Sequence, residues 1–313
     1  MAGIQVSTRS QPSSPTTAES GTGQRRTEIS RACDAKQVPY VIAQLSDVHI
    51  GGPHVGSGER FSEAIAEINA MQRQPDLVLL TGDNTHKGTG VEWDEFTHRL
   101  SALRATWEAI SGNHDRTITA TAGHRAMDAG PLRLVLVDSS HDEFTDNDAA
   151  WLEAELASRP TAEIVIAIHH PPFETGIWWM DCVGLKGADL FEQVVRRHPQ
   201  VVKVLSGHVH RTIQTNWAGC SLWVSASTSV AVAGDLHPDH DPAETAEPPA
   251  FSLHAYTGRG IVSHVVPVGS SATRSPIEAS AAGFVRLGAL NPTRPGQSLQ
   301  VGARSNIHEH WFR

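Results

Sequence analysis

The segment Leu77-Val78-Leu79-Leu80-Thr81-Gly82-Asp83-Asn84 joins a short apolar run to a glycine and two polar side chains. A run of this length that ends at a glycine is typical of a buried β-strand. Gly82 permits a sharp exit from the strand, so the Asp83 side chain can turn away from the apolar run. The segment therefore predicts an internal strand that ends in a carboxylate.

Four other polar clusters also follow apolar, β-prone runs. They are Asp47-Val48-His49, Gly112-Asn113-His114-Asp115, His169-His170 and Gly207-His208-Val209-His210. In α/β proteins, ligands bind at the carboxyl ends of strands, and all of these clusters sit at such ends. Their mixed nitrogen and oxygen atoms suit Mn, Fe, Zn, Co or Ni better than Ca or Mg. None of them contains a cysteine, which argues against a structural Cys-type zinc site.

The hydrophobic pattern alternates between strands and helices, with more strands in the second half of the chain. The predicted helices are 60–71, 92–103, 145–157 (with a cap at Thr145 or Asp146) and 188–197. The predicted strands are 38–45, 76–80, 106–110, 132–137, 164–168, 201–205, 212–217, 221–226, 251–256 and 261–266. The pattern therefore indicates helices packed on a sheet.

The two ends of the 313-residue chain differ in composition from the middle. Residues 1–37 are rich in Ser, Thr, Gly and Gln, and such a stretch buries too little surface to offset its ordering entropy. We predict a disordered tail there, a catalytic domain over 38–268, and a flexible or loosely packed tail over 269–313. Residues 235–249 are rich in His, Asp, Glu and Pro, and we interpret them as a flexible loop.

Charge and cysteine content narrow the classes of function. The net charge of −9 argues against a non-specific nucleic-acid binder, which needs a basic surface. Three widely spaced cysteines argue against a disulfide framework and favour the reducing cytoplasm. No run is long and apolar enough for a membrane span. Arg25-Arg26 lacks the apolar stretch that a twin-arginine export signal requires.

The order of the five clusters resembles the calcineurin-like metallophosphoesterases over about residues 38–268. This resemblance implies an α/β fold of four layers, a β-sandwich flanked by helices on both sides. It also implies a metal-dependent phosphoric diester hydrolase with two transition-metal ions, Fe, Mn, Zn or Co. The sequence does not say which of these ions is native, because the donor set accepts several.

The resemblance assigns the metal ligands by position. Asp47, His49 and His210 would hold one ion. Asn113, His169 and His208 would hold the other, and Asp83 would bridge the two. In such a pair a bridging water becomes hydroxide near neutral pH, and this hydroxide is the predicted nucleophile.

Two further residues are predicted to be catalytic. His114 matches a histidine that orients the phosphate or protonates the leaving alkoxide in similar enzymes. We expect Asp115 to fix the His114 tautomer by a hydrogen bond, with a simple turn cap as an equal alternative. His169 fits the ligand better than His170, because the family pattern is H-x-P and Pro171 follows. The sequence leaves the roles of His170 and His141 open.

Within the family, the flanking residues resemble the bacterial class III cyclic-nucleotide phosphodiesterases. They are His169-His170-Pro171-Pro172-Phe173, Gly176-Ile177-Trp178-Trp179-Met180-Asp181, Gly207-His208-Val209-His210-Arg211 and Val224-Ser225-Ala226-Ser227-Thr228-Ser229. The implied reaction is hydrolysis of 3′,5′-cyclic AMP to 5′-AMP. The alternatives are a phosphodiesterase or phosphatase for glycerophosphodiesters or other small esters and, less favoured, a metal-binding scaffold without turnover.

Three points stay open at this level. Trp178 and Trp179 either wall a substrate pocket and stack on a base, or form a hydrophobic plug or dimer contact. Asn84 and His86 stand where similar proteins often have Leu and Asp, and neither is a predicted ligand. Dimers are common among similar proteins, but the sequence does not give the oligomeric state.

Overall fold

Two mixed sheets, whose central strands are apolar and buried, form the core of the computed structural model, which describes residues 38–269. The first sheet has the order β13 (Ile261–Pro267), β12 (Ala250–Tyr256), β1 (Tyr40–Leu45), β2 (Leu77–Thr81) and β3 (Trp107–Ile110). Strands β1, β2 and β3 run parallel, and β12 pairs antiparallel with β1 and β13.

The second sheet has the order β4 (Arg125–Ala129), β5 (Leu132–Val137), β6 (Ile164–Ile168), β7 (Val201–Ser206), β9 (Cys220–Val224) and β8 (Ile213–Trp217). Its four central strands are parallel, and the edge strands β4 and β8 are antiparallel to their neighbours. A separate two-stranded pair joins β10 (Ala231–Val232) to β11 (Glu244–Thr245).

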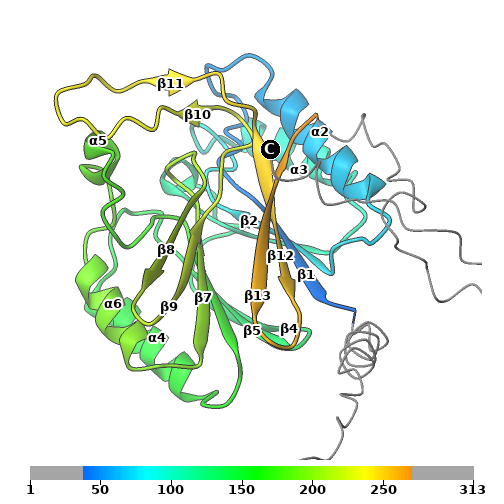
Figure 1. Cartoon of the computed structure of the whole chain (residues 1–313). Coiled ribbons are helices and arrows are strands. Elements are labelled where there is room, and N and C mark those ends of the chain that lie inside the picture. The colour runs from blue at the N-terminus through cyan, green and yellow to red at the C-terminus, as the bar shows by residue number, and fades with distance from the viewer. Residues whose placement is uncertain (1–37, 270–313) are drawn as a thin grey trace, which may run out of the picture. The chain divides into compact units, whose positions relative to one another are not determined.

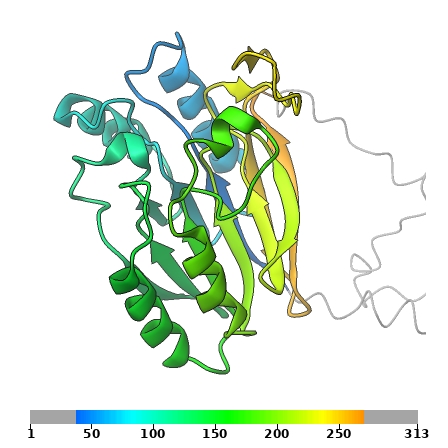
Figure 2. The same ribbon diagram turned by 90° about the vertical axis from the view of Figure 1, so that its left-hand side faces the viewer.

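Helices cover the outer face of each sheet (Figure 1). Helices α2 (Ser57–Ala70) and α3 (Gly90–Leu100) pack on the first sheet, where the rings of Phe61 and Phe96 stack at 5.5 Å. Helices α4 (Asp146–Ala157) and α6 (Ala188–Arg196) lie side by side on the second sheet (Figure 2). A third apolar cluster fills the space between the sheets. The predicted four-layer sandwich with helices on both sides is therefore confirmed.

The structure corrects some details of the sequence prediction. Strand β4 was not predicted, because Arg125-Ala126-Met127-Asp128-Ala129 has no apolar alternation and is formed by pairing with β5. The segment interpreted as a flexible loop contains β11, which pairs with β10. Thr145 caps α4 as expected, with its hydroxyl accepting from Asp148 N. Apart from Gly269, the predicted tails lie outside the described residues. No helix within residues 38–269 is long and apolar enough to cross a membrane.

A buried glutamine links the two sheets below the polar strand ends. Gln44 on β1 is fully buried, and its amide nitrogen donates to Thr81 Oγ1 on β2 and to Ser206 O on β7, each at 2.9 Å. Gln44 Oε1 lies 2.9 Å from Nε2 of the buried His254 on β12. Since buried polar groups are costly unless they are paired, this set favours one relative placement of the strands that carry the clusters.

Lys203 on β7 is also buried, and replacing it with methionine is expected to stabilise the protein. Burial lowers the pKa of Lys203 to about 8, so the folded state disfavours the charged form. This penalty is complete below pH 8 and disappears as the pH rises toward the ordinary lysine pKa. Urea unfolding of Lys203→Met should show a free energy of unfolding that is higher by about 1–3 kcal/mol at pH 7.

The same comparison at higher pH provides the control. The difference between Lys203→Met and the parent protein should shrink between pH 8 and the ordinary lysine pKa of about 10.4, because the parent then loses its buried charge. A destabilised variant at pH 7 would show instead that the 3.3 Å contact from Lys203 Nζ to Ser221 Oγ outweighs the cost of burial.

Candidate metal centre

The loops that follow the parallel strands are joined by backbone hydrogen bonds at one edge of the sandwich. Asp47 N donates to Gly82 O at 3.1 Å and His49 N donates to Asp83 O at 2.9 Å, so the loops after β1 and β2 run together. Gly207 N donates to His169 O at 2.9 Å, which joins the loops after β6 and β7. Asp47 Oδ1 accepts from His208 N at 3.1 Å, and Asp83 Oδ1 accepts from His114 N at 2.9 Å. Together these bonds bring the five clusters of the sequence analysis to one place.

The backbone at this edge is strained. Among the described residues, seven other than glycine have positive φ, and five of them are predicted metal ligands. These five are Asp47, His49, Asp83, His208 and His210, with φ between 50° and 70°. Left-handed conformations are uncommon for residues with a Cβ atom and concentrate at functional sites.

Glycines allow the loops to approach one another closely. A Cβ atom on Gly112 would lie 2.2 Å from Asp83 Oδ1, and one on Gly207 would lie 2.0 Å from Ser46 Oγ. A Cβ atom on Gly82, whose φ is 93°, would lie 2.5 Å from His169 Nδ1. The glycines of three clusters are therefore needed for close packing around Asp83 and Asp47.

The first predicted ligand set, Asp47, His49 and His210, is assembled with short distances between donor atoms. His49 Nε2 lies 3.0 Å from His210 Nε2, and His210 Nε2 lies 3.6 Å from Asp47 Oδ1. His210 Nδ1 faces Val230 O at 2.9 Å, which leaves Nε2 with its lone pair. Two imidazole nitrogens that face each other beside a carboxylate fit a cation between them.

The second predicted set gathers around Asp83. His169 Nε2 lies 3.4 Å from Asp83 Oδ2 and 3.2 Å from Asn113 Oδ1, and its Nδ1 faces Thr81 O at 2.8 Å. His208 is buried, and its Nε2 has no hydrogen-bond partner among the described residues. Asp83 Oδ2 is also 3.5 Å from His49 Nε2, so this carboxylate lies between the two sets.

Electrostatics at the site follow from this crowding. Burial opposes the charge on Asp83, but His169 and His49 outweigh burial and hold the pKa of Asp83 well below its usual value. Burial also opposes the charge on His169, but the nearby Asp83 raises the pKa of His169 to about 9. For Asp47, burial dominates and raises the pKa of its carboxyl. Buried carboxylates and imidazoles at these distances, with an unpaired nitrogen on His208, fit bound divalent ions.

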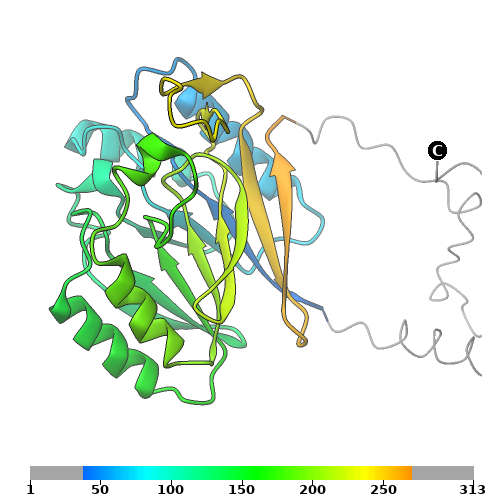
Figure 3. The same cartoon turned by 60° about the vertical axis from the view of Figure 1, so that its left-hand side comes forward.

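The site opens into a cavity of about 700 Å³. His49, Asp83, Asn113, His208 and His210 line it, whereas Asp47 and His169 are fully buried behind them. Trp179 and Met180 of the short helix α5 (Trp178–Asp181) also line this cavity. Trp178 instead donates from Nε1 to His240 O, so it holds α5 to the segment between β10 and β11 (Figure 3).

The two predicted catalytic residues, His114 and Asp115, lie in different surroundings. His114 lines the cavity, with Nδ1 2.7 Å from His86 O and Nε2 4.0 Å from Asp83 Oδ2. Asp115 is buried and does not bond the His114 ring. Its carboxylate accepts from Asn84 N, Asn84 Nδ2, Thr85 N, Thr85 Oγ1 and Gly112 N. The expected Asp115–His114 hydrogen bond is therefore wrong, and the alternative of a loop cap describes Asp115.

Two histidines that the sequence left open are now placed. His141 is exposed and does not line the cavity. His170 is buried beside His208, with ring centroids 4.4 Å apart, and its Nδ1 lies 2.9 Å from Ser139 Oγ. His170 Nε2 lies 3.3 Å from Asp142 Oδ1 but without the alignment of a hydrogen bond. His170 therefore packs behind the site rather than facing the cavity.

Sequence reasoning missed part of the cavity lining. His86, Arg116, Asp142 and Glu244 all line the cavity. The available signal for His86 was its place three residues after Asp83, on the loop that Asp115 fixes. Asp142 and Glu244 are brought in by loop contacts, Asp142 with Arg116 and Glu244 with His54 at 3.1 Å, which no spacing in the sequence indicates.

Two curated proteins that are similar to this chain are phosphodiesterases. A probable glycerophosphodiester phosphodiesterase of Arcobacter nitrofigilis is 29% identical over 255 residues, 73% of this chain and 93% of that protein. The 3′,5′-cyclic adenosine monophosphate phosphodiesterase CpdA of Escherichia coli K12 is 25% identical over 222 residues, 66% of this chain and 78% of its own.

Solved structures share the fold at low identity. A dimetal phosphatase of Danio rerio has a TM-score of 0.53 at 13% identity, covering 74% of this chain and 99% of its own. The purple acid phosphatase PPD1 of yellow lupin has a TM-score of 0.56 at 14% identity, covering 75% of this chain and 52% of its own. The calcineurin-like phosphoesterase family model matches residues 40–212, more than half of the chain. The chain is therefore a metal-dependent phosphoester hydrolase that belongs to the calcineurin-like phosphoesterase family.

Proposed function

We propose that this chain is a dimetal phosphodiesterase that hydrolyses 3′,5′-cyclic AMP to 5′-AMP. The observation that carries the proposal is the position of Asp83 between two sets of donor atoms that open into one cavity. In it, Asp47, His49 and His210 hold one ion, Asn113, His169 and His208 hold the other, and Asp83 serves both. Ions bound there would supply positive charge to neutralise the phosphate and would lower the pKa of a bound water.

The chain's own residues orient the substrate and handle the proton. Water adds to phosphorus and the bond from phosphorus to the 3′ oxygen breaks, so this oxygen must gain a proton. In our proposal His114 donates that proton from Nε2 as an imidazolium, because its Nδ1–H is already donated to His86 O and the neutral ring has only a lone pair on Nε2. The backbone N–H of His114 donates to Asp83 Oδ1 at 2.9 Å, which fixes the ring beside the site.

The cavity supports a substrate with an organic group the size of a nucleoside. Trp179, Met180 and Val232 give it an apolar wall on which a base can stack. The likeness to the cyclic-nucleotide phosphodiesterase of Escherichia coli supports the same substrate class. The net charge of −9 argues against nucleic acid as the substrate. We place the reaction in the cytoplasm, because Cys182 and Cys220 form no disulfide within residues 38–269 and the three cysteines of the chain are widely spaced.

A second candidate is a phosphodiesterase for glycerophosphodiesters. The Arcobacter nitrofigilis relative supports it, and so do the charged residues Lys186 and Glu244 on the cavity wall, which suit a small polar substrate. Both candidates use the same predicted metal ligands. The residues that line the cavity wall therefore determine which of the two substrates is preferred.

Substrate competition tests the proposal. The Mn-loaded protein is assayed on 3′,5′-cyclic AMP, 2′,3′-cyclic AMP, glycerophosphodiesters and bis(p-nitrophenyl) phosphate. We expect the highest kcat/KM for 3′,5′-cyclic AMP. A higher value for a glycerophosphodiester favours the second candidate. If the metal-loaded protein turns over none of these esters, both phosphodiesterase candidates are overturned. Only the alternative of a metal-binding scaffold without turnover then remains.

A further inference from the structure

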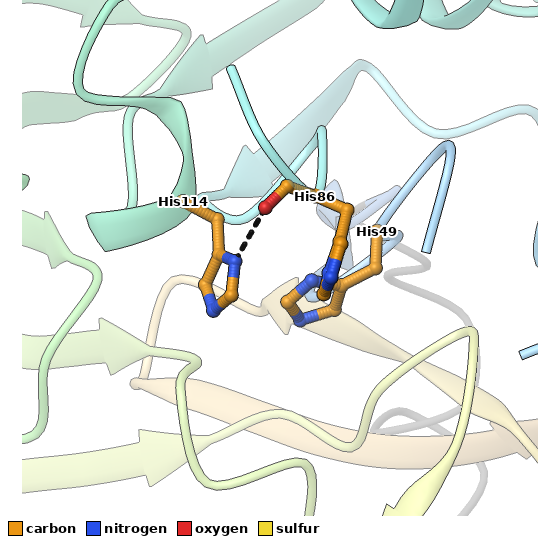
Figure 4. A group of neighbouring side chains, drawn as sticks. All are labelled: His49, His86 and His114. Atoms are coloured by element: carbon orange, nitrogen blue, oxygen red, sulfur yellow. Dashed lines mark hydrogen bonds between the residues drawn. The ribbon is translucent and has the colours of Figure 1, made fainter. Parts of the chain in front are cut away.

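Three histidines meet at the outer side of the candidate metal centre (Figure 4). They are His49 from the loop after β1, His86 from the loop after β2 and His114 from the short 3-10 helix η1 (Asn113–Asp115) after β3. One ring nitrogen from each lies within 4.8 Å of the others. The rings of His86 and His114 are stacked at 5.1 Å, and the His49 ring meets both of them edge-on at 5.7 and 4.7 Å.

Each ring has a nitrogen available for a ligand. His114 Nδ1 is taken by His86 O at 2.7 Å, which leaves Nε2. His49 Nε2 faces His210 and Asp83, and its Nδ1 is buried with no hydrogen-bond partner in the described part of the chain. His86 Nδ1 is likewise buried with no hydrogen-bond partner among the described residues. Buried polar atoms normally have partners, so two such atoms on adjacent rings point to a ligand.

The loop that carries His86 is held rigidly. His86 N donates to Ile50 O at 2.9 Å, and Thr85 is bonded through both its N and Oγ1 to Asp115. Lys87 N donates to Glu92 Oε2 at 3.0 Å. Little backbone movement is therefore needed to present His86, and both His86 and His114 line the cavity, where an ion can reach them.

We propose that His49, His86 and His114 form a third, inhibitory metal site that takes Zn²⁺ or a similar borderline ion. Three imidazole nitrogens are a donor set that such ions prefer, at about 2.0–2.1 Å from each nitrogen. An imidazole that binds two ions releases its remaining N–H proton to solvent, so His49 gives up that proton when both of its nitrogens are occupied. The inhibition rests on the proposed function, because the ion occupies the His114 nitrogen that protonates the leaving oxygen.

Zinc binding and inhibition are measured together. The full chain carrying two zinc ions is titrated with ZnCl₂, bound zinc is counted after equilibrium dialysis, and hydrolysis of bis(p-nitrophenyl) phosphate is followed. We expect a third ion to bind as activity falls. His86→Asn keeps the backbone carbonyl that holds His114. This variant should bind the third ion with an affinity that is lower by about tenfold or more. Each variant's activity is expressed relative to its own uninhibited activity. The zinc concentration that halves this relative activity should rise by the same factor.

The matched control is His54→Asn. His54 lines the same cavity and undergoes the same chemical change, but its partner is Glu244 and it is outside the cluster. It should bind the third ion and respond to zinc as the parent does. A zinc count that stays at two, or a His86→Asn variant that behaves like the parent, overturns the proposal. If no ester is hydrolysed, the zinc count still tests the site, so this failure is distinguishable from failure of the proposed function.

Discussion

Asp83→Asn is expected to lower kcat/KM for every phosphoester by at least about 10³-fold, which corresponds to roughly 4 kcal/mol of transition-state stabilisation. The asparagine keeps the shape of the side chain and an oxygen that can accept from His114 N. It removes the negative charge that lies 3.5 Å from His49 Nε2 and 3.4 Å from His169 Nε2. In the proposed centre Asp83 serves two cations, so we expect the neutral amide to hold at most one of them tightly.

The measurement combines metal analysis with steady-state kinetics. We expect fewer than two tightly bound ions per chain in Asp83→Asn. Asp128→Asn is the control, since Asp128 is an exposed carboxylate on β4 that pairs with Arg133. It should leave both metal content and kcat/KM unchanged. Retention by Asp83→Asn of activity within tenfold of the parent at saturating metal would refute the shared-carboxylate arrangement.

Gly112→Ala is expected to have the second-largest effect, although it adds only a methyl group. The new Cβ atom would lie 2.2 Å from Asp83 Oδ1, 2.5 Å from Asp83 N and 2.8 Å from His169 Nε2. Since one of these contacts is with backbone, the loops after β2 and β3 must separate. We expect a loss of about 2–3 kcal/mol in the free energy of unfolding. A displacement of about 1 Å at the ligands should also lower activity by about 10²-fold.

Gly90→Ala supplies the comparison for Gly112→Ala. A Cβ atom on Gly90 meets nothing within 4 Å, and Gly90 is the first residue of α3. The same substitution should therefore be neutral or slightly stabilising there, with activity unchanged. Urea unfolding and bis(p-nitrophenyl) phosphate hydrolysis of the two variants give the contrast. Equal effects at both glycines would show that close approach at Gly112 is unimportant.

Most of the fold could be predicted because the decisive strands are apolar on both faces. The strands Leu132–Val137 and Ile164–Ile168 have the bounds that the sequence predicts, since each is mostly apolar and a polar side chain follows it. Strand β4 could not be found in this way, because Arg125–Ala129 becomes a strand only through pairing with β5. The pairing of β11 with β10 is likewise a tertiary contact between segments without a hydrophobic pattern.

In the candidate site, too, some features could be predicted from the local sequence and others depend on tertiary contacts. The polar groups after β1, β2 and β3 could be expected together, because parallel strands end at the same edge of a sheet. The partners of Asp115 could not be predicted, since they depend on how the loop of Asn84 and Thr85 folds around its carboxylate. The part played by His86 also depends on tertiary contact, the stacking of its ring on that of His114.

The left-handed backbone at five of the predicted ligands implies a trade-off between stability and function. Each such residue with a Cβ atom costs about 1 kcal/mol relative to glycine. Glycine at His49 or His210 would relax the backbone while it removes an imidazole, so a selection for thermal resistance alone would favour loss of the site. Screens that improve stability in this chain should therefore exclude these positions, because the most stable substitution there is also an inactive one.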